Sequence, residues 1–131
     1  MEEIEVGIKQ SKIQSNRVYY YDSEPTILTK QIEKITKYKI RKRKLEDEVK
    51  RIEESNNPNK ERELENLNKK DTLGNLNFDS IIISDFNESL KSIVTSLLYT
   101  DVSPENVYFL TLNQWFDQSL LKEKNFQPIY F

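Results

Sequence analysis

The chain contains neither cysteine nor histidine among its 131 residues. The lack of cysteine excludes disulfides, thiolate metal sites and cysteine nucleophiles together. The lack of histidine removes the commonest general base and metal ligand, and with it every Ser-His-Asp or Cys-His arrangement. The sequence also shows no glycine-rich phosphate loop, no nucleophile elbow and no metal-ligand spacing. We therefore expect a protein that is not an enzyme and that uses no cofactor and no metal.

Neither sign of charge dominates, since Lys and Arg number 20, Asp and Glu number 22, and the net charge is −2. Such a balance creates no general field that would attract nucleic acid or acidic lipid. The basic run 41–44 is followed directly by the acidic run 46–48, at helical spacing. This order predicts a solvated helix face, rather than a nucleic-acid site, with the ion pairs Lys42–Glu46, Arg43–Asp47 and Lys44–Glu48.

Hydrophobic residues make up only 36% of the chain, which predicts a small core or one that is shared with another segment. No apolar run approaches the roughly 18 residues that a membrane-spanning helix needs. The N-terminal sequence MEEIEVGIKQ is acidic and polar, unlike a secretory signal peptide. As written, the chain is expected to stay in the cytoplasm and to cross no membrane.

The first half of the chain carries mainly helical patterns. Residues 1–15 form a marginal helical pattern, and residues 17–21, rich in tyrosine, predict a strand that ends before Pro25. Apolar residues at helical spacing from Thr26 to Ile52 predict one long helix or two joined ones. A turn at 54–59 and a second helix at about 60–70 complete a charged antiparallel helical hairpin, bounded at 36–70.

The second half alternates strands with helices. The segment Phe78–Asp85 reads as a buried parallel strand, and a helix follows from Asn87. A strand at Val107–Leu112, a short helix at Phe116–Lys124 and a strand at Gln127–Phe131 complete the order β-α-β-α-β over residues 76–131. Helix-length connections between strands predict an α/β fold with a parallel sheet and right-handed crossovers.

Three runs of the sequence together resemble one known family: ITKYKIRKRKLEDEVKRIEE, LENLNKKDTLGNLNFDSIIISDF and LLYTDVSPENVYFLTLNQW. They resemble the C-terminal lobe of the penicillin-binding-protein activators, bacterial lipoproteins with a type 1 periplasmic-binding-protein fold. The resemblance covers roughly 18–131 and includes the turn Asp71–Gly74 and Trp115. It departs where the family has a glycine after a strand, because this chain has Thr111 and Leu112.

The resemblance implies a single partial domain over residues 1–131, in which a partial doubly wound parallel sheet carries the inserted hairpin. A first lobe and one central strand, between residues 18–21 and 78–84, would then lie upstream of Met1. The chain would be a gene remnant or the product of a split gene. The resemblance also implies a periplasmic relative that binds and stimulates penicillin-binding proteins, which build peptidoglycan.

Asp85 and Trp115 are the candidate ligand-binding residues. A carboxylate after a parallel strand lies where open α/β sheets bind ligands, and Trp115 would stand at the edge of the cleft. An enzyme that used Asp79, Asp85 and Asp117 as acid, base or Mg²⁺ ligands has no supporting motif.

Three hypotheses about function remain open. The first is a scaffold whose exposed hairpin binds a penicillin-binding protein or the missing upstream lobe. The second is a lobe that binds a small, amino-acid-like molecule with Asp85 and Trp115. The third is a vestigial product with no function. None of the three involves nucleic acid.

Overall fold

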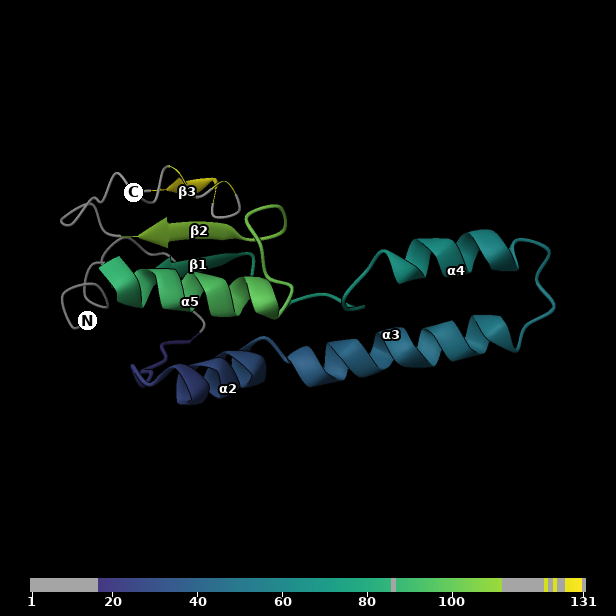
Figure 1. Cartoon of the computed structure of the whole chain (residues 1–131), viewed down its shortest axis with the longest axis horizontal. Coiled ribbons are helices and arrows are strands. Elements are labelled where there is room, and N and C mark those ends of the chain that lie inside the picture. Colours follow the sequence, from purple (N-terminus) through teal and green to yellow (C-terminus); the bar gives the residue numbers. More distant parts are fainter. Residues whose placement is uncertain (1–16, 86, 112–121, 123, 125–126, 131) are drawn as a thin grey trace.

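The computed structural model describes residues 17–85, 87–111, 122, 124 and 127–130. Within these residues the chain forms an α/β body from which a pair of helices projects as an arm (Figure 1). The elements, in chain order, are α2 (Pro25–Ile35), α3 (Tyr38–Glu53), α4 (Lys60–Asn68), β1 (Ser80–Ile83), α5 (Asn87–Tyr99), β2 (Tyr108–Thr111) and β3 (Ile129–Tyr130). The helical pattern predicted for 1–15 and most of the helix predicted for 116–124 lie outside the described residues.

The body contains a three-stranded parallel sheet in the order β1-β2-β3. Ile81 pairs with Phe109, and Phe109 in turn pairs with Ile129. All three strands lie inside the segments in which the sequence predicts them, and α5 connects β1 to β2 (Figure 1). The α/β class and the parallel sheet are therefore confirmed.

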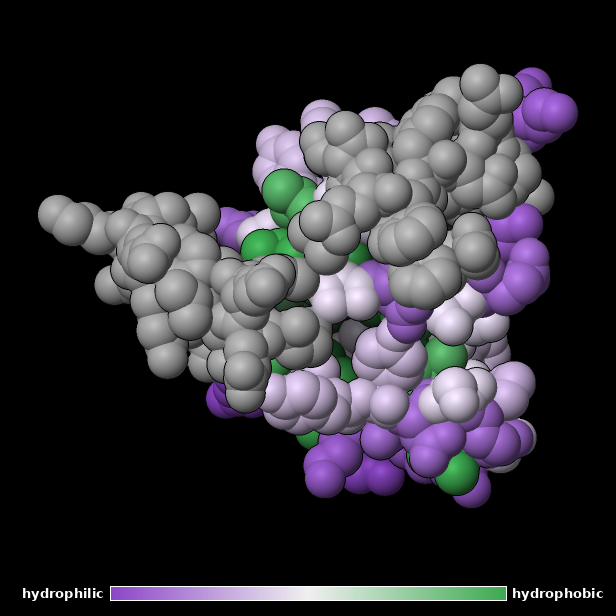
Figure 2. Space-filling view, turned by 90° about the vertical axis from the view of Figure 1, so that its left-hand side faces the viewer, coloured by the Kyte–Doolittle hydropathy of each residue, from purple (hydrophilic) through white to green (hydrophobic). Residues whose placement is uncertain are grey.

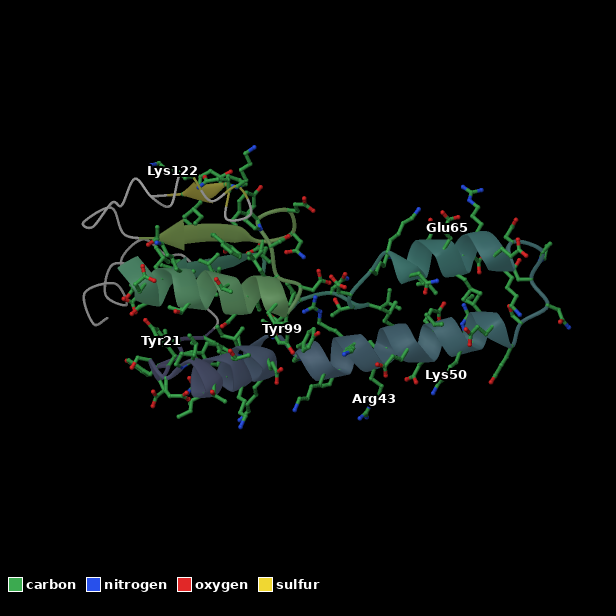
Figure 3. The ribbon with its side chains drawn as sticks, in the orientation of Figure 1. Tyr21, Arg43, Lys50, Glu65, Tyr99 and Lys122 are labelled. Carbon is green, nitrogen blue, oxygen red and sulfur yellow. The ribbon has the colours of Figure 1, made fainter. Side chains whose placement is uncertain are left out.

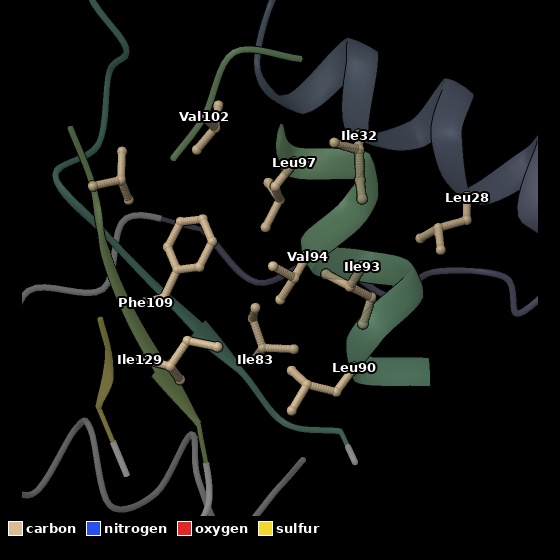
Figure 4. Packing of buried hydrophobic residues seen from close by; sticks show 11 residues of the cluster. Leu28, Ile32, Ile83, Leu90, Ile93, Val94, Leu97, Val102, Phe109 and Ile129 are labelled. Carbon is tan, nitrogen blue, oxygen red and sulfur yellow. The ribbon is translucent and has the colours of Figure 1, made fainter. Parts of the chain in front are cut away.

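The core lies between the sheet and α5. One face of the sheet contributes Ile83, Phe109 and Ile129, which pack toward Val94 and Leu97 of α5 (Figure 4). Helix α2 covers the other side of α5 with its own buried residues Leu28 and Ile32. Burying each such side chain stabilises the fold by about 1.5–3 kcal/mol, so this cluster holds the body together.

Local signals set the bounds of α2 and α3. The Glu24 carboxylate accepts a hydrogen bond from the amide of Ile27 at 2.9 Å, and Pro25 occupies the first turn of α2, where its missing amide costs nothing. At the other end, Lys37 adopts a left-handed conformation with φ of 53°, which separates α2 from α3. The long apolar stripe therefore belongs to two joined helices.

The strand predicted for residues 17–21 is wrong. Val18, Tyr19, Tyr20 and Tyr21 are exposed and form no strand, although their side chains favour one. Strand formation needs a paired neighbour, and β-propensity alone does not supply it. In the described part of the sheet β1 is an edge strand.

The antiparallel hairpin predicted for 36–70 is present as the arm of α3 and α4 (Figure 1). Its seam is thin, because Ile52 is its only buried apolar residue and the others are half-buried. At its tip the ammonium of Lys60 donates a hydrogen bond to the carbonyl of Glu53. Two helices with so little buried area need an attachment to the body in order to keep their position.

The ion pairs predicted along α3 are wrong. Lys42, Arg43 and Lys44 form no ion pair within the described residues, and Glu48 instead binds Arg51, with 2.6 Å between Oε1 and Nη2. A base that precedes an acid by four residues is the weaker orientation on a helix, so these pairs gain little from forming.

Candidate functional site

The carboxyl edge of the sheet is the first place where a ligand could bind. Asp85 follows β1 and Thr111 ends β2, so the parallel direction of the strands brings both to one edge. The Thr111 hydroxyl donates to the main-chain carbonyl of Asp85 at 3.5 Å, and Asp85 is half-buried. Asp85 therefore lies at the predicted position, on the edge where open α/β sheets bind ligands.

The Thr111 side chain is buried at this edge, with an exposed fraction of 7%. Trp115, the second predicted ligand-binding residue, lies outside the described residues, and its pairing with Asp85 stays a prediction. Figure 2 views the molecule from the end at which β2 terminates, and hydrophobic residues reach the surface there among hydrophilic ones.

The three aspartates of the enzyme hypothesis are not brought together as far as the structure describes them. Asp79 precedes β1, where its carboxylate accepts a hydrogen bond from the Ser80 hydroxyl at 3.0 Å, and Asp85 follows the same strand. The full length of β1 separates the two, while Asp117 lies outside the described residues. In the described part of the chain no three acidic side chains gather to hold a metal ion.

A buried arginine is the most elaborate polar arrangement of the described residues. Arg41 of α3 is only 5% exposed. Its Nη1 donates to the carbonyls of Thr100 at 3.0 Å and Thr36 at 3.4 Å. Its Nη2 donates to the Thr72 hydroxyl at 2.8 Å and to the carbonyl of Asp101 at 3.1 Å.

Asp101 completes this cluster. Its Oδ2 lies 3.7 Å from Nη2 of Arg41 and accepts a hydrogen bond from the Thr72 hydroxyl. Burial lowers the pKa of Arg41, and the neighbouring Asp101 carboxylate partly offsets this effect. A guanidinium stays protonated through such a shift, so Arg41 keeps its positive charge. Asp101 has a φ of 58°, in the left-handed region.

The Arg41 cluster joins the arm to the body. Thr36 caps the end of α2, Thr72 follows α4, and Thr100 and Asp101 follow α5. The amide of Leu73 also donates to the carbonyl of Arg41 at 3.0 Å. Arg41 therefore connects the two chain segments at the base of the arm, which are the start of α3 and the segment after α4. Within the described residues, Nε of Arg41 is the one buried side-chain nitrogen or oxygen that forms no hydrogen bond.

Sequence reasoning missed Arg41, because it assigned the whole basic run 41–44 to a solvated helix face. The signal was present, since Leu45, Val49 and Ile52 define a helical face whose next position toward the N-terminus is Arg41. The remaining basic residues of the run are exposed, as expected.

Comparisons with protein-family models, with curated proteins and with solved structures find no match to this chain. None of the helices in the described ranges combines the length and the apolar character that crossing a bilayer requires. The function therefore has to be argued from the body, the arm and the cluster that joins them.

Proposed function

We propose that the chain is a non-catalytic binding module, related to the activators of penicillin-binding proteins, whose arm docks on a peptidoglycan-synthesising penicillin-binding protein. The observation that carries the proposal is the arm itself, which projects from the body and is fixed at its base by the buried Arg41 (Figure 1). The family resemblance supplies the partner and the periplasmic setting.

The surface of the arm suits a protein partner. Lys42 and Glu46 on α3, and Glu61 and Arg62 on α4, are exposed and form no ion pair within the described residues. Charges of both signs on a preformed helix pair favour orientation and selectivity in protein contacts. Because the helices are already folded and anchored, binding loses little conformational entropy.

A charge exchange on the arm tests the proposal. The variant Lys42→Glu, Glu46→Lys, Glu61→Lys, Arg62→Glu keeps the net charge and alters only exposed side chains. Binding to an immobilised, purified bifunctional penicillin-binding protein would be measured by biolayer interferometry. We expect the unaltered chain to bind. The exchanged arm should bind with at least about a tenfold weaker affinity, because several attractive charge contacts at the edge of the interface become repulsive.

The matched control exchanges two exposed charges of the body, with Glu105→Lys and Lys122→Glu. The control should bind as the unaltered chain does. Equal affinity of the arm variant and the control, or no binding by the unaltered chain, would overturn the proposal.

A second candidate function is the binding of a small, amino-acid-like molecule at the carboxyl edge of the sheet. The position of Asp85, two residues after the end of β1 and beside Thr111, favours this alternative. Thermal melts with millimolar amino acids would test it, since a ligand that binds only the folded state stabilises that state by RT ln(1 + [L]/Kd) and so raises the melting temperature. Asp85→Ala should abolish the shift, whereas Asp79→Ala at the opposite end of β1 should retain it.

A further inference from the structure

The balance of charge over the whole chain conceals a local excess of basic residues in the range 25–44. Eight of these 20 residues are basic and one, Glu33, is acidic, so the range carries a net charge of +7. Outside it, 12 basic residues stand against 21 acidic ones. The range comprises α2, the junction at Thr36 and Lys37, and the first two turns of α3. The two signs of charge are therefore separated along the chain.

All but one of these basic residues face the solvent. Arg41 is buried in the cluster at the base of the arm. The other seven are exposed, and they are Lys30, Lys34, Lys37, Lys39, Lys42, Arg43 and Lys44. Glu33 offsets them only in part, with its carboxylate 4.0 Å from the ammonium of Lys39. The excess of positive charge is therefore a property of the surface.

Five of the exposed basic residues form one face of the molecule. Helices α2 and α3 follow each other along this side, and α5 and α4 pack against their other sides (Figure 1). The hollow between α2 and α3 is lined by basic residues of both segments, namely Lys30, Lys34, Lys37 and Lys39. Arg43 continues this face along α3 and points away from α4, whereas Lys122 lies on the other side of the molecule, next to the sheet (Figure 3). We call the four lysines and Arg43 the basic face.

The basic face suits an extended anionic partner better than a small anion. At the rise of an α-helix, the 20 residues of the range span about 30 Å. This length is several times that of a single phosphate or carboxylate group. Lysines spread over such a length attract several anionic groups at once, and their mutual repulsion is relieved when an anionic surface covers them.

Two exposed isoleucines favour a lipid bilayer over a nucleic acid. Ile27 lies one helical turn before Lys30 and is 44% exposed, while Ile40 lines the hollow and is 57% exposed. Such side chains enter the boundary between lipid headgroups and acyl chains, whereas a phosphodiester backbone offers them no apolar surface. Tyr38, the one aromatic residue of the range, already packs against Tyr99 with 5.4 Å between the ring centroids. The range therefore lacks the free aromatic rings on which bases stack.

We infer that the basic face binds the surface of an anionic lipid bilayer, with its lysines on the phosphate groups and with Ile27 and Ile40 among the uppermost acyl carbons. The contact is peripheral and needs no helix that crosses the membrane. The face ends where the acidic run 46–48 begins, so the outer half of the arm stays free for a protein partner. The inference thus goes beyond the proposed function and does not depend on it.

Co-sedimentation with vesicles tests the inference. The unaltered chain would be mixed at low salt with vesicles of phosphatidylcholine, either alone or with about 30% phosphatidylglycerol. We expect at least about tenfold stronger binding to the anionic vesicles, because each lysine near such a surface strengthens binding by about fivefold. Raising the salt from about 0.05 to 0.5 M should remove most of this difference, because screening at the higher salt acts over a few ångströms.

A lysine variant and a matched control locate the contact. The lysine variant replaces the four lysines of the hollow, with Lys30→Gln, Lys34→Gln, Lys37→Gln and Lys39→Gln. It should bind anionic vesicles at least about tenfold more weakly than the unaltered chain. The control replaces four exposed lysines elsewhere, with Lys69→Gln, Lys70→Gln, Lys122→Gln and Lys124→Gln. It has the same net charge as the lysine variant and should bind as the unaltered chain does.

A third variant separates a bilayer from a soluble polyanion. Ile27→Gln with Ile40→Gln keeps every charge and removes the two side chains that enter the bilayer. This variant should bind anionic vesicles at least about threefold more weakly. A single-stranded DNA of about 20 nucleotides serves as a polyanion without acyl chains, and the unaltered chain should bind it more weakly than the anionic vesicles. Circular dichroism melts of all variants would establish that they are folded.

Absence of binding to anionic vesicles, equal binding to neutral and anionic vesicles, or equal binding by the lysine variant and its control would overturn the inference. Tighter binding to the DNA than to the vesicles, or full vesicle binding by the isoleucine variant, would assign the basic face to a soluble polyanion and overturn it as well. The outcome is separable from the penicillin-binding-protein experiment, because all of these variants keep the four residues that are exchanged in the arm. Failure of one experiment therefore leaves the result of the other unchanged.

Discussion

Replacing Arg41 by alanine should destabilise the protein far more than any other change in the basic run 41–44. The guanidinium donates hydrogen bonds to three main-chain carbonyls and one hydroxyl; three of these contacts are buried, and the one to the carbonyl of Asp101 is partly buried. Removing one partner from a buried charged arrangement costs about 3–5 kcal/mol. The ion pair itself adds little, because the Asp101 side chain is 36% exposed.

We therefore expect Arg41→Ala to lower the free energy of unfolding by about 3 kcal/mol, which is a large part of the 5–15 kcal/mol of an ordinary domain. Urea denaturation followed by far-UV circular dichroism measures this quantity. The matched control is Arg43→Ala, which removes the same side chain from an exposed position of the same helix. It should change the free energy by less than about 0.5 kcal/mol.

The result that refutes this reasoning is equal stability of the two alanine variants. Arg41→Lys provides a further comparison, because lysine keeps the charge but cannot reach carbonyls on both sides with a planar fork. It should lose most of the stabilisation, and full stability in this variant would show that charge alone, rather than the fork of hydrogen bonds, holds the base of the arm.

Three further changes have defined outcomes. The amide of Ile27 lowers the pKa of Glu24 below 4.5, so the stabilisation by this cap is complete above pH 4.5 and is lost as the pH falls through the lowered pKa. Melts recorded between pH 6 and pH 3 should show a steeper loss in the unaltered chain than in Glu24→Ala. Phe109→Ala, at a position with 0% exposure, should cost about 3–5 kcal/mol in urea denaturation. Lys37→Gly should raise the melting temperature, because φ of 53° strains every residue except glycine by about 1 kcal/mol.

The strands and helices of the second half could be predicted because their signals are local. The run Ile81–Ile83 is continuous, β-branched and apolar, as in parallel strands, and β1 occupies it. The face of α5 follows from the spacing of its apolar residues, and the two sides of that helix meet the sheet and α2. The position of Asp85 after β1 follows from the end of the same run.

The tyrosine-rich segment 17–21 shows what local signals leave out. Its residues favour a strand as strongly as those of β2 do, yet a strand exists only where a neighbouring backbone pairs with it. Pairing is a long-range property of the fold, and composition carries no information about it.

The burial of Arg41 could not be predicted for a different reason. The sequence gives the residue type, whereas the structure shows that the side chain is buried. An apolar side chain at this position would fill the same space, although it would leave the carbonyls of Thr36, Thr100 and Asp101 without their donor. Apolar contacts are not directional, however, whereas the guanidinium fixes α3 relative to α2, α5 and the segment after α4 through hydrogen bonds of defined geometry. A methionine at position 41 would therefore destabilise the base of the arm and leave the arm free to tilt. An anchor that fixes the direction of the arm, in addition to stabilising its base, is what a protein needs if its arm must meet a partner in one orientation.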